Sequence, residues 1–402
     1  MRAVARRNGR ARGLGHARRE GETVLILGTA QRAAQATARS LSRAGFRVVG
    51  AWEGGRLAGR TRYCERLYRI PPASATEAFL AAVREIGERE SVRAVVPLSD
   101  ELQGALLTDP GAAAPAVVLG PSLEEFRRLC DKVGLIETAG SAGLQCPASA
   151  VVTHGGAREL PPLPAYLKVV TSMYSGRAAG RPVRVHDRVT CEQLLDELTH
   201  DGDTVLVQGE ITGRQWRYDF VRGREWVHAL ASVQLADYPY RVGQSTVLQF
   251  GAMPPQLAER SLRLLTEAGY HGVGSIQWIE HAGDWFVHDV NLRLPASVAG
   301  MIAAGLDMPR LAVEAALGHE PPPQAAALRP VRYVWLEGEM ISLRDTLAGA
   351  RSGRSAAGIA GSLLLAAVSP ARRLVPFDLS DPLPTLAAVS AVARVPRSVS
   401  PA

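Results

Sequence analysis

Lysine and asparagine are almost missing from this sequence. Among 46 lysines and arginines only Lys132 and Lys168 are lysines, and Asn8 and Asn291 are the only asparagines. Wherever positive charge alone suffices, the chain uses arginine, whose planar guanidinium cannot replace the compact ammonium of lysine. We therefore expect the two lysines and Asn291 to have been kept for a specific chemistry and to mark a site.

Cysteine is also scarce, and it shows no spacing that binds metals. The four residues Cys64, Cys130, Cys146 and Cys191 are scattered, without a Cys-x-x-Cys pair or a Cys/His cluster. This pattern argues against structural zinc and is typical of a reducing cytoplasm, so we expect each to be a small buried residue. The apolar stretch 356–368 is too short to span a membrane.

Basic charge is concentrated at the start of the chain. The net charge is +7 and the pI about 9.5, and part of the excess comes from residues 1–21, which are rich in arginine and glycine. This segment lacks the apolar core of a signal peptide and has no interleaved aromatics, so we expect a disordered leader. We predict a cytoplasmic protein with no nucleic-acid or membrane partner, whose remaining positive charge suits an anionic substrate such as ATP.

Strand and helix patterns alternate over residues 22–120, which predicts a small α/β domain with a parallel sheet. Of the dinucleotide-binding fingerprint only Gly28 is present, which argues against a dinucleotide site. Asp100 and Glu101 follow the carboxyl end of a predicted strand, where open α/β sheets bind ligands. They either bind part of a substrate or cap the next helix, and we favour the cap.

Residues 274–294 predict two strands joined by a turn over 280–284. Asp289 and Asn291 are two residues apart and share a face of one strand, and Gln277 lies on the other strand. One carboxylate and two amide oxygens are hard ligands that suit Mg²⁺. Arg293, on the same face, offers a planar cation to a phosphoryl group. An ordinary hairpin with an exposed polar face is the alternative.

The run Asp289-Val-Asn-Leu-Arg293, with Gln277 upstream by 289 − 277 = 12 positions, resembles the metal-binding end of the ATP-grasp superfamily. The similarity is to its carboxylate–amine ligase and carbamoyl phosphate synthetase branch, although the family usually has Glu where this chain has Asp289. The resemblance implies an α/β (α+β) fold in four parts: the leader, a Rossmann-like pre-ATP-grasp domain over 22–120, a two-lobed ATP-grasp domain over 121–325, and a small C-terminal appendage over 326–402. In the appendage we expect one short apolar helix.

Other segments match the family in the same order. Lys132 and Lys168 match its two phosphate-binding lysines, and the stretch 208–211 matches the hinge strand that binds adenine. The small-residue loop over 171–182 is poorer in glycine than the family's loop, and Trp216 replaces an acid that many members use for the ribose. The resemblance implies these sites: catalytic, Lys168 and Arg293; nucleotide-binding, Lys132, Lys168, Ser175, Gly176, Gln208, Gly209, Glu210 and Ile211; metal-binding, Gln277, Asp289 and Asn291; substrate-binding, Arg241 and Ser245.

The reaction that the resemblance implies is ATP-dependent ligation. A substrate carboxylate attacks the γ-phosphate to give an acyl phosphate and ADP, and an amine then displaces the phosphate. Mg²⁺ is the expected metal, Mn²⁺ a second candidate, and a homodimer is compatible with the sequence. Two alternatives stay open: a carboxylase or carbamoyl-phosphate-type enzyme that activates bicarbonate, and a non-catalytic nucleotide-binding protein.

Overall fold

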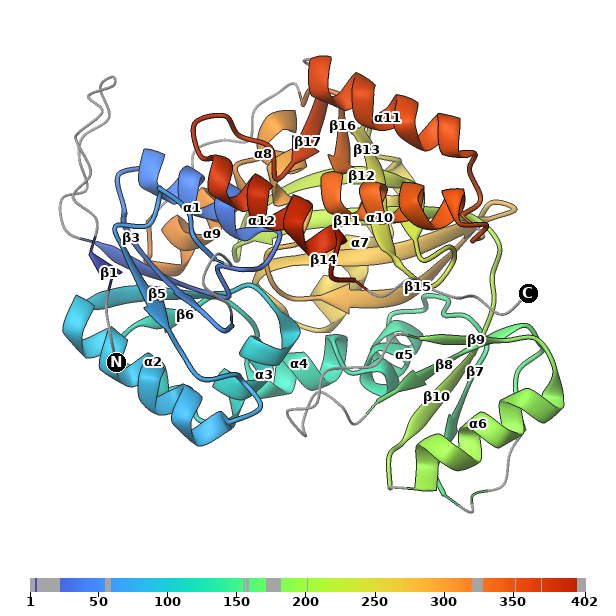
Figure 1. The fold of residues 1–402 in the computed structure, drawn as a ribbon. Helices are drawn as coiled ribbons and strands as arrows, with labels where there is room; N and C mark the ends of the chain where they lie inside the picture. The colour runs from blue at the N-terminus through green and yellow to red at the C-terminus, as the bar shows by residue number, and fades with distance from the viewer. Residues whose placement is uncertain are drawn as a thin grey trace.

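Three β-sheets organise the chain in the computed structural model (Figure 1). The structure describes residues 4–5, 22–54, 59–154, 156, 159–170, 182–200, 202–319, 328–350, 352–369 and 371–395. The loop with Ser175 and Gly176, and all of the predicted leader except residues 4–5, lie outside this part of the chain.

The first sheet has the order β1-β4-β3-β2-β5-β6 and is parallel except for β1. The alternation predicted for residues 22–120 is confirmed, and β4 is a strand that the pattern did not predict. The elements are β1 (Val4–Ala5), β2 (Thr23–Leu27), α1 (Ala34–Arg43), β3 (Arg47–Trp52), β4 (Arg66–Arg69), α2 (Thr76–Glu90), β5 (Val92–Pro97), α3 (Asp100–Thr108), a 3₁₀ turn (Pro110–Ala113) and β6 (Val117–Val118).

Two short helices lead from this sheet to the rest of the molecule, α4 (Leu123–Leu129) and α5 (Lys132–Ser141). The predicted capping box at the start of α4 is present, because Ser122 and Glu125 each accept a hydrogen bond from the other's backbone. Asp131 caps α5 and so fixes Lys132 at its first position. Gly134 is required here, since a Cβ would lie 1.8 Å from the carbonyl oxygen of Arg127.

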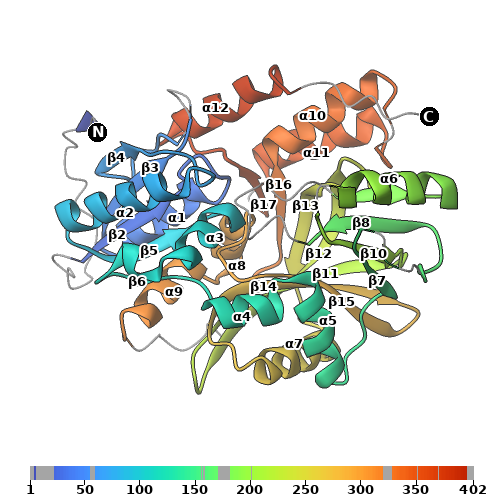
Figure 2. The ribbon, with the colours of Figure 1, turned by 90° about the horizontal axis from the view of Figure 1, so that it is seen from below.

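The second sheet is antiparallel, with the order β7-β10-β8-β9, and helix α6 packs on it. It lies at the opposite end of the molecule from the first sheet in both views (Figures 1 and 2). Lys168 lies on β8, as predicted. The elements are β7 (Ser149–Val152), β8 (Ala165–Val169), β9 (Val183–Val185), α6 (Arg188–His200) and β10 (Val205–Gly209).

The third sheet has seven strands in the order β15-β14-β11-β12-β13-β16-β17, antiparallel except for the pair β16–β17. Trp278, Tyr218 and Phe220 on one face pack against α4, α5 and α7, and the opposite face carries polar side chains. The elements are β11 (Arg214–Arg222), β12 (Val227–Tyr238), β13 (Gln244–Gly251), α7 (Pro255–Glu267), β14 (Gly272–His281), β15 (Asp284–Asn291), α8 (Val298–Ala304) and α9 (Met308–Ala316).

The tail contains more structure than the single apolar helix that we predicted. It forms β16 (Val331–Trp335), α10 (Leu336–Leu347), α11 (Ala356–Val368), β17 (Arg372–Val375) and α12 (Pro382–Val392). Strands β16 and β17 extend the third sheet. No helix among the described residues is long and apolar enough to cross a bilayer.

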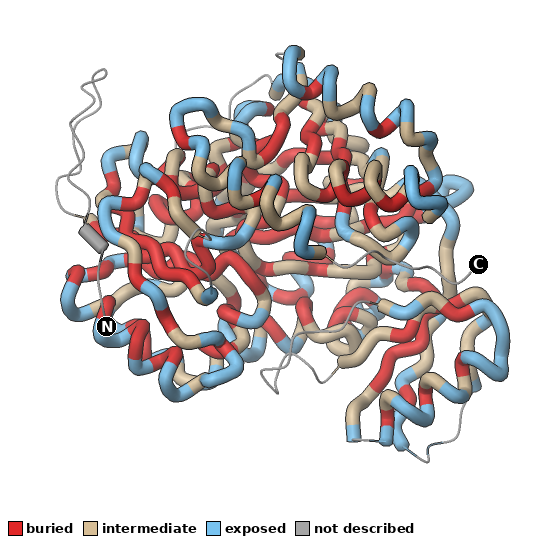
Figure 3. The backbone as a smooth tube through the Cα atoms, in the orientation of Figure 1, coloured by how far each residue is buried: buried red, intermediate tan, exposed pale blue. Residues whose placement is uncertain are grey.

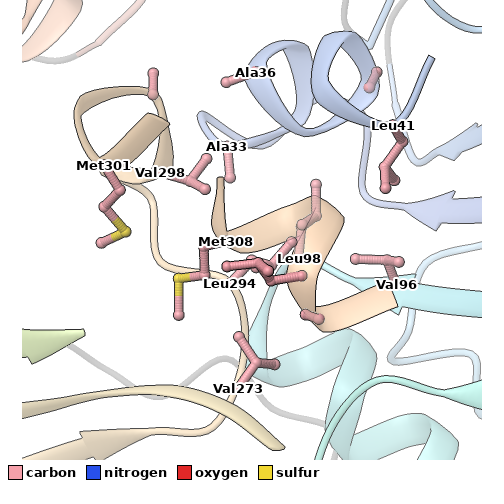
Figure 4. Packing of buried hydrophobic residues seen from close by; sticks show 14 of the residues in the cluster. Ala33, Ala36, Leu41, Val96, Leu98, Val273, Leu294, Val298, Met301 and Met308 are labelled. Carbon is pink, nitrogen blue, oxygen red and sulfur yellow. The ribbon is translucent and has the colours of Figure 1, made fainter. Parts of the chain in front are cut away.

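One hydrophobic cluster joins the first sheet to the third. Ala33 and Leu41 of the α1 region pack with Val298 and Met301 of α8 and with Met308 of α9 (Figure 4). Buried residues follow the strands of both sheets (Figure 3). Because this core is shared, the loops of the first sheet are held against the polar face of the third.

Candidate functional site

A cavity of about 480 Å³ lies where the three sheets meet. Its walls come from both ends of the molecule as well as from the third sheet, and most of the predicted site residues line it. Those on the walls are Lys132, Lys168, Gln208, Gly209, Ile211, Arg241, Ser245, Gln277, Asp289, Asn291 and Arg293.

The hairpin β14–β15 brings three polar side chains to one face. Gln277 is opposite Asp289, and Ser275 is opposite Asn291. The turn between the strands is shorter than predicted: His281 still pairs with Asp284, which leaves Ala282 and Gly283, both with positive φ. The predicted turn over 280–284 is therefore wrong by three residues, while the predicted shared face is confirmed.

A β-bulge lies within this hairpin. Gln277 pairs with Asp289 and Trp278 with Val287, so His288 has no partner on β14. The extra residue changes the direction of the strand locally, and both His288 and Asp289 line the cavity. Burial, with Lys168 nearby, lowers the pKa of His288 to about 3, which keeps its imidazole neutral. Regular alternation of side chains along a strand predicts that His288 and Asp289 point to opposite faces, so the sequence pattern alone did not place His288 in the cavity.

Asp289 is the centre of a compact polar cluster. Its carboxylate accepts hydrogen bonds from Lys132, from Gln277 at 2.7 Å and from Asn291 at 2.8 Å. Burial by itself raises the pKa of Asp289, but the charge and hydrogen bond of Lys132 and the charge of Lys168 together outweigh it and hold that pKa well below its usual range. The three rare residues singled out by composition are thus confirmed to converge on one cavity, Lys132 and Asn291 directly on Asp289.

The donor set of this cluster fits a hard divalent cation. One carboxylate and two carboxamides converge, and Mg²⁺ commonly uses one or two carboxylates together with waters and substrate phosphates. The ammonium of Lys132 donates to the same carboxylate, at Oδ1. Among the described residues there is no cluster of three His, Cys, Asp or Glu side chains of the kind that binds transition metals.

Lys168 approaches the cavity from β8. Its ammonium donates to the side-chain oxygen of Gln208 at 2.7 Å, and Gln208 donates to Ser149 at 3.2 Å. Burial, reinforced by Lys132, lowers the pKa of Lys168 to about 8. No carboxylate in the described part of the chain forms an ion pair with Lys168, so its charge is available to an anion.

Arg293 is paired inside the protein. Its guanidinium makes a two-pronged contact with Asp100, with Nε–Oδ1 2.6 Å and a second bond of 2.7 Å. The preferred assignment of Asp100 and Glu101 as a helix cap is wrong, because Ser99 accepts the capping bond from Leu102. Asp100 instead orients Arg293 at the cavity wall.

Glu210 and Arg241 also pair with each other. The Glu210 carboxylate accepts from Arg184 at 2.5 Å, from Arg241 at 3.1 Å and from the hydroxyl of Tyr166 at 3.1 Å. Burial raises the pKa of Glu210, but Arg184 and Tyr166 outweigh it and the pKa is lowered. Glu210 and Arg241 therefore both have charged partners within the protein. The assignment of Glu210 to the nucleotide and of Arg241 to the substrate stays a prediction.

The predicted adenine-binding strand is β10 with the residues that follow it. Gly209 and Ile211 line the cavity. The N–H groups of Gly209 and Glu210 donate to the carbonyls of Ala148 and Pro164, at 2.8 and 2.9 Å. Trp216, where we expected an acid, donates its indole N–H to Glu280 at 2.8 Å.

Sequence reasoning missed two arginines of the cavity. Arg217 lies on β11 with its Cα opposite Gln277, and Arg32 follows β2 at the carboxyl edge of the first sheet. Both reach Ser245, which the sequence did single out. The position of Arg32 just past a parallel strand was an available signal, because such edges bind ligands.

Comparison of structures finds relatives of this fold, whereas comparison of sequences finds none. No family model matches this chain, and no curated protein does. The fold, however, is similar to many known structures.

An L-amino acid ligase from Bacillus licheniformis superposes with a TM-score of 0.62 at 16% identity, covering 77% of this chain and 78% of that one. An N5-carboxyaminoimidazole synthetase from Staphylococcus aureus in complex with ADP gives 0.63 at 13% identity, with 82% and 86% covered. The chain has an ATP-grasp fold. A biotin carboxylase from Campylobacter jejuni, solved with an ATP analogue, gives 0.61 at 17% identity, with 77% and 74% covered.

The expected α/β architecture is thereby confirmed. In this ATP-grasp fold the four-stranded sheet and the third sheet face each other across the cavity, and the first sheet closes one end. At these identities the likeness concerns the fold, and the roles of individual residues have to be argued from the cavity itself.

Proposed function

We propose that this protein is an ATP-dependent, Mg²⁺-dependent ligase that activates a carboxylate as an acyl phosphate for attack by an amine. The observation that carries the proposal is the convergence of Lys132, Lys168, Asp289, Asn291 and Arg293 on one cavity from separate elements. The named activities of the L-amino acid ligase and the carboxyaminoimidazole synthetase support the same class of reaction.

The cations of the cavity fit phosphoryl transfer. Lys168 and Lys132 would bind the phosphates, and Arg293, held by Asp100, would face the transferring group. Asp289, Asn291 and Gln277 would hold Mg²⁺, which supplies charge neutralisation at the phosphates. When nucleotide and metal bind, Lys132 would leave Asp289 and turn to phosphate oxygen, since a flexible ammonium follows the nearest negative charge.

No protein nucleophile is required for this chemistry. The four cysteines are not reactive: three are buried, and burial raises the pKa of Cys64 and Cys130 to about 12 and that of Cys146 to about 11. The protein's contribution is positioning and charge stabilisation of two small substrates and ATP.

Acceptor-dependent release of ADP is the test. The full chain is incubated with Mg²⁺-ATP and pools of carboxylates and amines, and ADP and phosphate are measured. We expect release that needs both an acid and an amine. ADP release driven by bicarbonate alone would favour the alternative of a bicarbonate-activating enzyme. Tight ATP binding with flat turnover over all pools would favour a nucleotide-binding protein without catalysis.

A further inference from the structure

We propose that Arg217 and Arg32 form a subsite for a carboxylate that does not itself react, so that the protein selects a substrate of the amino-acid or dicarboxylic-acid class. This inference rests on the proposed function in one respect: the bound carboxylate is taken to be a substrate of the ligase. The subsite itself is argued from side chains that neither the phosphate nor the metal cluster uses.

Arg217 points into the cavity with a neutral partner. It lies on β11, its Cα opposite Gln277, and its guanidinium donates to the hydroxyl of Ser245 at 2.8 Å. Ser245 donates onward to the side-chain oxygen of Gln234. Among the described residues no carboxylate forms an ion pair with Arg217. A guanidinium on a cavity wall with only a hydroxyl bonded to it has capacity left for an anion.

Arg32 reaches the same point from the first sheet. It donates to the backbone oxygen of Ser245 at 3.3 Å and to the side-chain oxygen of Gln244 at 2.5 Å. Its guanidinium lies 3.9 Å from the ring centroid of Trp335, which fixes its plane. Two guanidinium groups, one from each side of the cavity, therefore meet at Ser245.

Carboxylates lie near both arginines, Asp219 and Asp289 near Arg217 and Glu337 near Arg32, but among the described residues none forms an ion pair with either. Burial lowers the pKa of Arg217, and the charge of Asp219 opposes this shift more strongly than the charge of Arg32 reinforces it. Asp219 lies on the same face of β11, two residues on, and burial raises its own pKa to about 6, so it still carries most of its negative charge at neutral pH. The other cavity arginines, Arg241 and Arg293, already have carboxylate partners. Arg32 and Arg217 are thus the arginines of the cavity wall that form no ion pair with a carboxylate in the described part of the chain, which leaves them able to bind one from a ligand.

The position of the subsite indicates which kind of anion binds there. Ser245 lies on β13, four strands from β15, which carries Asp289, in the order β15-β14-β11-β12-β13, so Ser245 and Asp289 lie well apart across the sheet. The phosphates are expected at the Asp289 cluster. A planar fork matches a carboxylate with two parallel hydrogen bonds. A small substrate spanning the two points has its reacting group at the phosphates and its second carboxylate at the arginines.

The test compares each acid with its own amide. The twenty L-amino acids, succinate and glutarate, and the matching primary amides, are titrated by calorimetry into the full chain with Mg²⁺ and a non-hydrolysable ATP analogue. We expect at least one acid to bind about tenfold or more tighter than its amide. In Arg217→Gln the two should bind within about twofold of each other, and Arg217→Lys should recover part of the preference.

Two further variants keep the test decisive. Arg214→Gln changes an exposed arginine on the opposite face of β11 and should leave the acid/amide ratio unchanged. Arg32→Gln alters a loop side chain and should lower the ratio severalfold even if Arg217→Gln fails to fold. A ratio near one in the unmodified protein, a ratio preserved in both Arg217→Gln and Arg32→Gln, or no binding by any acid overturns the subsite.

Turnover is measured in parallel so that the two proposals fail separately. If acids bind more tightly than their amides in an arginine-dependent way but no ADP is released, the carboxylate subsite is supported and the ligase activity is contradicted. If ADP is released but acids and amides bind equally well, the ligase activity is supported and the carboxylate subsite is contradicted.

Discussion

At the scale of single residues, the two lysines of the chain differ in their charge environment. Lys132 forms an ion pair with Asp289, whereas Lys168 donates a hydrogen bond to the neutral Gln208 and, among the described residues, forms no ion pair. An unmatched ammonium costs free energy in the empty cavity, and a triphosphate recovers that cost on binding. We therefore expect Lys168→Ala to weaken ATP binding about ten- to a hundredfold, measured by calorimetry. Binding within twofold of the unmodified protein would contradict a phosphate role.

Lys168 also predicts a pH dependence. Its pKa of about 8 lies below the ordinary value of 10.5, so it is charged below about pH 8 and loses its proton as the pH rises. ATP affinity should be level below pH 8 and fall above it, by at most about tenfold per pH unit. Lys168→Arg, which stays charged, should show no fall between pH 7.5 and 9.5. An unmodified protein with a flat profile over that range would refute this.

Lysine titration has the opposite effect on folding. Because the pKa of Lys168 is lowered in the folded protein, the unfolded chain binds more protons between about pH 8 and 10.5. The contribution of this residue to stability therefore rises with pH across that window.

Asn291 tests the metal assignment. Asn291→Ala removes one of the three proposed oxygen ligands, and we expect ADP release to need about ten- to a hundredfold more Mg²⁺. Asn291→Asp retains an oxygen ligand and should stay near the unmodified requirement. An alanine variant with an unchanged Mg²⁺ curve would remove Asn291 from the metal site.

At the scale of elements, the start of α4 illustrates a local motif that the fold retains. The N–H of Ser122 donates to Glu125 at 2.7 Å, and the N–H of Glu125 donates to the Ser122 hydroxyl at 3.3 Å. Ser122→Ala should lower the free energy of unfolding by about 1 kcal/mol, measured by urea denaturation. Glu124→Gln, at an exposed neighbouring position, serves as the control and should change it by less than about 0.5 kcal/mol.

At the scale of the whole molecule, the tail holds the first sheet in place. Asp381, buried at the start of α12, accepts hydrogen bonds from the Thr61 hydroxyl at 2.5 Å and the Arg62 N–H at 3.2 Å. Gln35 donates to it as well. These contacts join positions more than 300 residues apart, so the tail docks on the first sheet as well as extending the third.

Removing that contact should therefore weaken the whole assembly. Asp381→Ala leaves buried donors without acceptors, and we expect a loss of about 1–3 kcal/mol in the free energy of unfolding. Deletion of the tail from residue 377 onwards should lower the melting temperature further. Asp378→Ala, which breaks a contact with Arg39 at the edge of the same interface, provides a milder comparison. Unchanged stability in Asp381→Ala would show that the tail is merely appended.

The sequence by itself determined the local features of this protein: the α/β alternation, the capping box, the hairpin face with Asp289 and Asn291, and the significance of two lysines. The first three follow from periodicity or motif spacing in short stretches, and the lysines stand out from the composition of the whole chain. Tertiary structure alone decided that Arg293 pairs with Asp100, that a bulge turns His288 inward, and that Arg32 and Arg217 meet at Ser245. Such contacts join residues as far as 213 positions apart, and no local pattern encodes them, because they depend on how the sheets pack.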